Sequence, residues 1–422
     1  MVAALTKIAM RTIWFLWVVV VALAIRWLSR DNHSPLYIPT SLDLLTLTTH
    51  DIADLLGNNT INSLQITKEY LRRIELDDRS GLGLHTILEL TPVKSIISIA
   101  NERDLERRKG LIRSPLHGVP LIVKVNFNPL VQNTNVIDVA SARAIWPQIS
   151  LLFKHPCGSS AGSVAAVAAG FAPLALGTET QGSISCPASF TALYGLKVST
   201  GVLSRSGILS SSTTFDSPGI LAKSAWDIAA LLTEIDGVDD RDPITFESEG
   251  LLVNYTNSLD ASWADFRIGV ADKEWFWSIL PGFMFSAGFD VVREIERRGA
   301  TIVADAKIRS AYLSTGYVAK LMGRIIRYEM GPGFAQHVMG LEGTETKSLA
   351  DRLEFNRKFP ASSYSDETPA QNYLELALDQ KMTLEEYQDA LLEARKIAIE
   401  EGIIETLDSY NLDASFFPLG RI

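Results

Sequence analysis

The sequence has only two cysteines, Cys157 and Cys186, and six histidines among 422 residues. Two cysteines are too few for a disulfide scaffold or for a zinc site of their own, and the histidines lack the spacing of metal ligands. The chain also lacks internal repeats and any concentrated run of lysine and arginine. With a net charge of -10, it has no basic face of the kind that nucleic-acid binding requires.

What the chain does have is a composition typical of one large globular enzyme, with 47% hydrophobic and 21% charged residues. The hydropathy pattern predicts three parts. Residues 1–30 are predicted as a signal-anchor or signal peptide, residues 31–43 as a polar linker, and residues 44–422 as one globular domain.

The first part contains an uncharged, apolar run at residues 12–25, with basic residues on both sides. The run is short for a membrane-spanning helix and suits a signal peptide, for which Ala22-Leu23-Ala24 is an acceptable cleavage site. If Arg26 extends to the membrane surface, the run lengthens and a membrane anchor results. Both interpretations send the chain into the secretory pathway. Sequons at Asn32, Asn58 and Asn254 are consistent with a glycoprotein exposed to the lumen.

Residues 156–187 organise the rest of the chain. They read Pro-Cys-Gly-Ser-Ser-Ala-Gly-Ser, then an Ala/Val-rich run, then Leu-Gly-Thr-Glu-Thr-Gln-Gly-Ser-Ile-Ser-Cys-Pro. Residues 164–170 predict a short buried helix with a glycine C-cap, and residues 171–176 predict a buried strand. Residues 177–183 predict a loop that turns successive backbone N–H groups toward one point. A serine at the end of such a loop is a candidate nucleophile, because the N–H groups offer an oxyanion hole.

Three motifs resemble the amidase signature family, especially its fungal-type members: Gly118-Val-Pro-Leu-Ile-Val-Lys-Val-Asn126, Cys157-Gly-Ser-Ser-Ala-Gly-Ser163 and Gly177-Thr-Glu-Thr-Gln-Gly-Ser-Ile184. Members of that family hydrolyse amides with a Ser/cis-Ser/Lys triad and without a cofactor. By position, the resemblance implies that Lys124 is the base, Ser159 the cis-peptide serine and Ser183 the nucleophile. It also implies an α/β/α fold with a central mixed β-sheet covered by helices on both faces.

The residues around Lys124 support its role as the base. It follows four apolar or proline residues, so we expect its ammonium group to be poorly solvated. Burial disfavours the charged form and lowers the pKa, which makes a lysine a general base near neutral pH. The alternative is a lysine at the end of a strand that reaches solvent. The presence of Ser159 and Ser183 favours the base.

The predicted reaction is amide hydrolysis through a serine acyl-enzyme. Lys124 takes a proton from Ser159, Ser159 takes one from Ser183, and Ser183 attacks the carbonyl carbon. Water then releases the acid. The predicted oxyanion hole consists of four backbone N–H groups, those of Thr180, Gln181, Gly182 and Ser183.

Four further residues near the motifs have predicted structural roles. Ser160 is either a hydrogen-bond partner that supports the triad or the cap of the following helix. Asp216 is predicted to bond backbone groups in a turn. We interpret Cys157 and Cys186 as small core residues rather than as a disulfide. A bridge between them would constrain the chemistry, because both flank the serine turns.

Elsewhere, apolar spacing predicts helices at 63–74, 97–109, 224–235, 285–298 and 384–401, and strands at 86–90, 266–271 and 300–303. This alternating order is typical of an α/β domain. The polar, irregular region 328–373 corresponds to the variable helical lid over the substrate in the family.

Two departures from the family pattern bear on activity. Ser159 follows Lys124 by only 35 positions, whereas family members have a longer segment there. The sequence also stops where the last strands and helices of the family begin. We therefore expect a catalytic domain without an internal segment and without the C-terminal part. The alternative to an amidase is a catalytically inactive, amidase-like scaffold that binds an amide ligand or a partner.

Other functions fit the sequence less well. An amidotransferase subunit would need a partner that supplies the acceptor, and a membrane-targeting N-terminus does not suit it. Esterase activity is compatible with the same acyl-enzyme as a side reaction. The expected substrate is a small-molecule amide whose identity the motifs do not specify, and the oligomeric state is left open.

Overall fold

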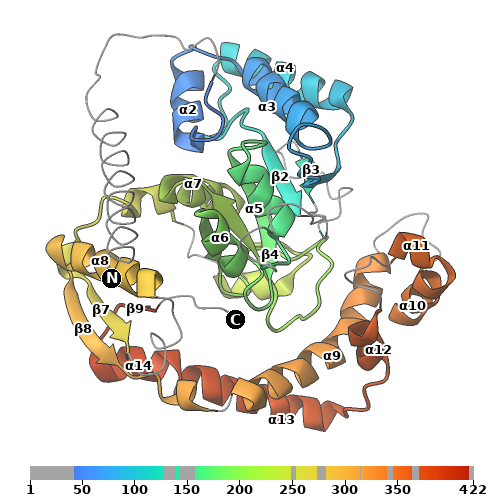
Figure 1. The fold of residues 1–422 in the computed structure, drawn as a ribbon, viewed down its shortest axis with the longest axis vertical. Helices are drawn as coiled ribbons and strands as arrows, with labels where there is room; N and C mark the ends of the chain where they lie inside the picture. Colours follow the sequence, from blue (N-terminus) through green and yellow to red (C-terminus); the bar gives the residue numbers. More distant parts are fainter. Residues whose placement is uncertain are drawn as a thin grey trace, which may run out of the picture. The chain divides into compact units, whose positions relative to one another are not determined.

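The centre of the fold is a six-stranded mixed β-sheet with the strand order β1-β3-β2-β4-β6-β5 (Figure 1). Its strands are β1 (Ile87–Glu89), β2 (Leu121–Lys124), β3 (Val139–Ala142), β4 (Leu174–Glu179), β5 (Tyr194–Lys197) and β6 (Ser217–Ala222). Strand β2 runs parallel to β3 and to β4, whereas the pairs β1/β3, β4/β6 and β5/β6 are antiparallel.

The structure is a computed structural model, and it describes residues 42–124, 126, 139–142, 157–248, 253–272, 282–313, 315–339, 346–363 and 370–417. Residues 43–422 form one compact unit. The predicted targeting segment, almost all of the predicted linker, Asn32 and most of the segment between Lys124 and Ser159 lie outside the described residues. Within the described ranges, no helix has both the length and the apolar character needed to cross a bilayer.

The two faces of the sheet pack against different helices. Ile122 and Leu221 contact one cluster, which includes α5 (Ala161–Ala168) and α6 (Ser185–Thr191). Their neighbours in the same strands belong to a second cluster, which includes α7 (Ala225–Ile235). Because successive side chains of a strand point to opposite faces, the sheet lies between two helical layers. The expected α/β/α architecture is confirmed.

The other elements surround this sheet. Three helices come before the motifs: α2 (Thr49–Gly57), α3 (Ser63–Asp77) and α4 (Val93–Arg108). A parallel three-stranded sheet of order β8-β7-β9 comprises β7 (Arg267–Ala271), β8 (Thr301–Ala306) and β9 (Ala414–Phe416). Two helices flank its strands in sequence, α8 (Gly282–Arg297) and α14 (Ile403–Tyr410). Between β8 and α14 lie α9 (Thr315–Met339), α10 (Leu349–Lys358), α11 (Pro360–Ser363), α12 (Asn372–Leu378) and α13 (Leu384–Arg395).

Local sequence explains where several helices begin. Thr48, Asn62 and Thr383 each accept a hydrogen bond from the backbone N–H three residues later, and the side chain at that later position bonds back to the backbone. Each capping box satisfies two N–H groups that a helix start would otherwise leave unpaired. These pairings fix the starts of α2, α3 and α13.

Two boundary predictions were wrong, those of β4 and of the helix at 384–401. Strand β4 runs from 174 to 179 rather than from 171 to 176, because residues 177–179 pair with residues 217–219 of β6. The region 328–373, predicted as a helical lid, is mostly helical where it is described, since α9 alone extends to Met339. The predicted helix at 384–401 ends at Arg395 and passes into a π-helical turn, Lys396–Glu400.

Substitution of Gly219 tests the close approach of strands β5 and β6 in the central sheet. A Cβ atom at this position would lie 2.1 Å from the carbonyl oxygen of Leu196 in the adjacent strand. We expect Gly219→Ala to lower the free energy of unfolding by about 2 kcal/mol or more, because backbone atoms cannot move aside as a side chain can. Urea unfolding of the variant beside the wild type measures the loss.

Gly57→Ala is the matched control. It is the last residue of α2, and a Cβ atom there would meet nothing within 4 Å. This variant should keep or slightly raise the free energy of unfolding, since alanine favours the helix. Equal stability of Gly219→Ala and wild type would contradict the close approach of β5 and β6.

Candidate active site

Lys124 and Thr178 lie at the same edge of the central sheet. Lys124 is the last residue of β2, Thr178 is the last but one of β4, and these strands are parallel neighbours. Their carboxyl ends therefore lie side by side. Lys124 Nζ donates to Ser159 Oγ at 2.7 Å, to Thr178 Oγ1 at 2.8 Å and to the Thr178 carbonyl oxygen at 3.2 Å. The structure thus brings together the predicted lysine and the predicted cis-peptide serine.

Lys124 is buried, with only 7% of its surface exposed. Burial lowers its pKa to about 8, while the negative charges of Asp216 and Glu179 oppose that change. Its three described partners are hydroxyl and carbonyl oxygens, so no carboxylate directly stabilises the charged form. The alternative of a lysine that extends into solvent is wrong.

The turn that carries Ser159 is tied to the loop that carries Ser183. The peptide bond between Gly158 and Ser159 is cis, as the resemblance implies. The backbone N–H of Ser160 donates to the carbonyl oxygen of Ser183 at 3.0 Å. Ser159 is exposed and Ser183 is partly exposed, so both side chains lie where a ligand has access.

Ser160 supports this arrangement through its side chain. Its buried Oγ donates to the Thr178 carbonyl oxygen at 3.2 Å and accepts from the Thr178 N–H at 3.3 Å. Although Ser160 precedes α5, its side chain makes no capping hydrogen bond. The interpretation as a helix cap is therefore wrong, and the residue instead joins the serine turn to the end of β4.

The backbone around Ser183 has the form of an anion-binding loop. Gly182 has a φ of 77°, which favours glycine. Among the described residues, the backbone N–H groups of Gln181, Gly182 and Ser183 have no hydrogen-bond partner, and neither has Ser183 Oγ. Three of the four N–H groups predicted for the oxyanion hole are thus free to bind a ligand. The fourth predicted residue, Thr180, bonds to Asp216 through its hydroxyl, and this contact does not occupy its backbone N–H.

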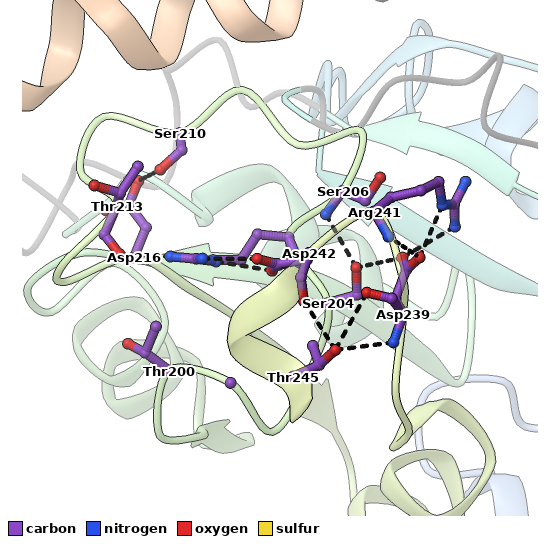
Figure 2. A network of polar contacts seen from close by, with 12 residues as sticks. Thr200, Ser204, Ser206, Ser210, Thr213, Asp216, Asp239, Arg241, Asp242 and Thr245 are labelled. Atoms are coloured by element: carbon purple, nitrogen blue, oxygen red, sulfur yellow. Dashed lines mark hydrogen bonds and ion pairs between the residues drawn. The ribbon is translucent and has the colours of Figure 1, made fainter. Parts of the chain in front are cut away.

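Two carboxylates hold this loop from either side. Glu179 Oε2 accepts from the N–H groups of Ile184 and Ser185 at 2.7 and 2.8 Å. Asp216 accepts a hydrogen bond from the Thr180 hydroxyl. It also accepts one from Ser210 Oγ, which lies 2.7 Å from Asp216 Oδ2 (Figure 2). These contacts fix the path of the chain before and after the free N–H groups.

Asp216 behaves as its turn sequence predicted, because it also accepts from two backbone N–H groups, those of Ser211 and Ser212. Glu179 and Thr178 were not identified as site residues from the sequence. The signal was present, since both lie in the motif that ends at Ile184. The motif shows which residues recur in the family but not which atoms they contact.

Cys157 and Cys186 form a disulfide, so their interpretation as separate core residues was wrong. The hydrogen bond between Ser160 and Ser183 brings the two turns together. The Cα atoms of the two cysteines then lie 5.7 Å apart, within the range that a disulfide spans. The bridge joins the serine turn to the first turn of α6.

Comparison with known proteins agrees with this geometry. The family model for amidases matches residues 152–418, more than half of the chain. This chain belongs to the amidase family. The match includes the serine turn, the anion-binding loop and the helical region that follows.

Individual relatives of this amidase-family chain are moderately similar. The solved structure of the native peptide amidase from Stenotrophomonas maltophilia is 30% identical, with a TM-score of 0.77 over 90% of this chain and 83% of that one. A glutamyl-tRNA(Gln) amidotransferase subunit of Clostridium botulinum is 30% identical over 302 residues, 62% of this chain. A putative amidase of Schizosaccharomyces pombe is 26% identical over 383 residues, 76% of this chain. The matches span 61% of the length of the clostridial relative and 64% of the yeast one.

The disulfide of this amidase-family chain gives a test of the site. It closes a loop with a sequence separation of 29. We expect Cys157→Ser/Cys186→Ser to lower the free energy of unfolding by about 3 kcal/mol, because the unfolded chain gains conformational freedom. Thermal unfolding of the oxidised wild type, the reduced wild type and the double variant measures the effect. Equal stability of all three would contradict a bridge in the folded protein.

Proposed function

We propose that this chain is an amide hydrolase in which Ser183 attacks a carboxylic acid amide. The observation that carries the proposal is the hydrogen bond between buried Lys124 and exposed Ser159, next to the free N–H groups before α6. A lysine with a pKa of about 8 has a useful fraction of its neutral form near neutral pH. A binding scaffold would not require such a base.

In the proposed reaction, protons pass from Ser183 through Ser159 to Lys124, and the same relay later returns a proton to the leaving amine. In its neutral form, Lys124 Nζ accepts the Ser159 proton while Ser159 Oγ accepts the Ser183 proton. Ser183 Oγ then forms a bond to the carbonyl carbon, and the N–H groups of Gln181, Gly182 and Ser183 bind the resulting oxyanion. The carbon–nitrogen bond breaks as the relay returns the proton to the leaving amine. Water repeats these steps and releases the acid.

A small-molecule or peptide amide is the proposed substrate class. Membership of the amidase family and the similarity to a peptide amidase support this class. The amidotransferase is the alternative kind of relative, but the apolar segment at residues 12–25 suits a membrane-targeted hydrolase better. An inactive scaffold is the competing interpretation that the following experiment addresses.

A fluorophosphonate probe tests the nucleophile in the full-length chain. We expect the probe to modify Ser183, as identified by mass spectrometry of the labelled peptide, because fluorophosphonates react with activated serines. Below about pH 8 the rate should rise about tenfold per pH unit, and above it the rate should level off, since only neutral Lys124 accepts a proton. Lys124→Arg should lose labelling at every pH up to about 10, because arginine stays protonated.

Ser183→Ala and Ser189→Ala form the matched pair of serine variants. Ser189 is exposed in α6, where its hydroxyl donates to the carbonyl oxygen of Cys186. Labelling should disappear in the first variant and persist in the second. A folded wild-type protein that is not labelled at Ser183 would establish the inactive scaffold instead.

We also propose that residues 1–30 direct the chain to the secretory pathway as a signal peptide or membrane anchor. The Cys157–Cys186 disulfide supports this, because disulfides persist mainly in oxidising compartments. Exposed side chains at Asn58 and Asn254, each in an Asn-x-Thr sequon, support it independently. Both asparagines lie on the surface, where a glycan has room.

Expression in a eukaryotic host tests this location. Treatment with peptide N-glycosidase should increase the electrophoretic mobility of the wild type. Asn58→Gln and Asn254→Gln should each remove one glycan and so reduce the size of that mobility shift. Alkaline carbonate extraction of membranes separates an anchored chain from a secreted one. Absence of any shift, together with free thiols at Cys157 and Cys186, would contradict the secretory proposal.

A further inference from the structure

The loop at residues 209–216, here called the serine loop, links the helical region to the candidate site through its contacts. At its end, Asp216 accepts from the hydroxyl of Thr180 in the anion-binding loop. At its beginning, the N–H of Leu209 donates to the carbonyl oxygen of Asn126 at 2.8 Å. The Asn126 side chain donates in turn to Thr178, which also accepts from Lys124. The serine loop therefore touches both the oxyanion side and the lysine side of the site.

Glu329 of α9 binds the middle of the serine loop. Its side chain is buried, with 5% of its surface exposed. Its carboxylate accepts from the hydroxyls of Ser212 and Thr214 and from the N–H of Thr214. The hydroxyl of Tyr387, in α13, donates to the same carboxylate. One anionic group thus satisfies four donors from the loop and from a second helix.

Apolar contacts place α9 against the same loop. Phe215 packs against Ile326 and Met330 of α9, and against a cluster that α9 shares with α13. Gly333, one turn after Glu329, would bring a Cβ atom within 3.3 Å of the Ser210 carbonyl oxygen. Backbone, carboxylate and apolar contacts therefore agree on the position of α9 over the loop.

The opposite side of the serine loop is held by a separate ion pair. Arg205 donates to both carboxylate oxygens of Asp242 and also to the carbonyl oxygen of Thr213. Figure 2 shows Thr213 and Asp216 beside this network, with Asp242 and Asp239 beyond them. Since Arg205 fixes one side of the serine loop, the contacts with Glu329 determine the position of its other side.

We propose that Glu329 is a positioning residue for amide hydrolysis, and the proposal rests on the function proposed above. Glu329 fixes the serine loop so that Asp216 holds Thr180, and Thr180 holds the oxyanion N–H groups where charge develops. Misplacement of such donors by a fraction of an ångström weakens stabilisation of the transition state without removing the base. Glu329 touches neither the substrate nor the nucleophile.

The proposal predicts a specific change in the pH profile of fluorophosphonate labelling. Glu329→Ala should lower the plateau rate at Ser183 about tenfold and keep the midpoint close to pH 8, because the oxyanion site moves while burial, the largest cause of the lowered pKa of Lys124, is unchanged. Glu329→Gln should lower the plateau rate by a smaller factor, since its amide oxygen still accepts a hydrogen bond from the Thr214 N–H. Tyr387→Phe should also lower the plateau rate, by a smaller factor than Glu329→Ala. If Glu329→Ala does not fold, the plateau rate of Tyr387→Phe tests the positioning role of Glu329.

Tyr317→Phe is the matched control. Tyr317 of α9 donates to Glu393 of α13, so it is a second tyrosine–glutamate contact between the same two helices. Tyr317 is exposed, and its contact with Glu393 does not involve the serine loop. Its plateau rate should equal that of the wild type. A comparable loss in Tyr317→Phe would mean that helix packing in general, and not the loop contact, controls the rate.

Two further results would overturn the inference, and they are distinguishable. If the wild type is labelled at Ser183 and the folded Glu329→Ala and Tyr387→Phe variants keep its plateau rate, Glu329 has no positioning role and the proposed function stands. If the folded wild type is not labelled, the proposed function fails and the inference fails with it. Thermal unfolding of every variant identifies the folded ones.

Discussion

The contact of Lys124 with Ser159 and Thr178 is the interaction on which the site depends. An ammonium group at this depth is costly, because burial removes its hydration and no carboxylate contacts it among the described residues. The cost is relieved when the group gives up its proton. The fold therefore places a buried lysine with a lowered pKa, rather than a salt bridge, at the end of β2. The parallel pairing of β2 and β4 and the buried contacts of Ser160 hold Lys124 against the serine turn.

Much of this arrangement was predictable because it depends on local sequence. The apolar run before Lys124 indicated its burial, the capping residues determine where several helices start, and the motifs have the order of the family. The alternation of helices and strands was enough for the α/β/α architecture. Such signals involve residues that are close in the chain, where spacing alone limits the geometry.

What could not be predicted depends on contacts between distant residues. Residues 177–179 resemble a loop because of their glycine, but pairing with β6 extends the strand through them. Cys157 and Cys186 gave no sign of a bridge until the hydrogen bond from Ser160 to Ser183 showed the two turns to be adjacent. Glu329 lies 117 positions from Ser212, so no local pattern connects them. Tertiary packing decides all three cases.

The disulfide has a topological consequence for the chemistry. Cys157 and Cys186 enclose α5 and β4 in a covalent ring that contains both Ser159 and Ser183. If a protease cut one peptide bond inside this ring, the two fragments would stay joined through sulfur. The serine turn and the anion-binding loop that carries Ser183 would then remain parts of a single molecule. The two serines are thus linked along two independent covalent paths, whereas a single covalent path, the main chain, joins Lys124 to them.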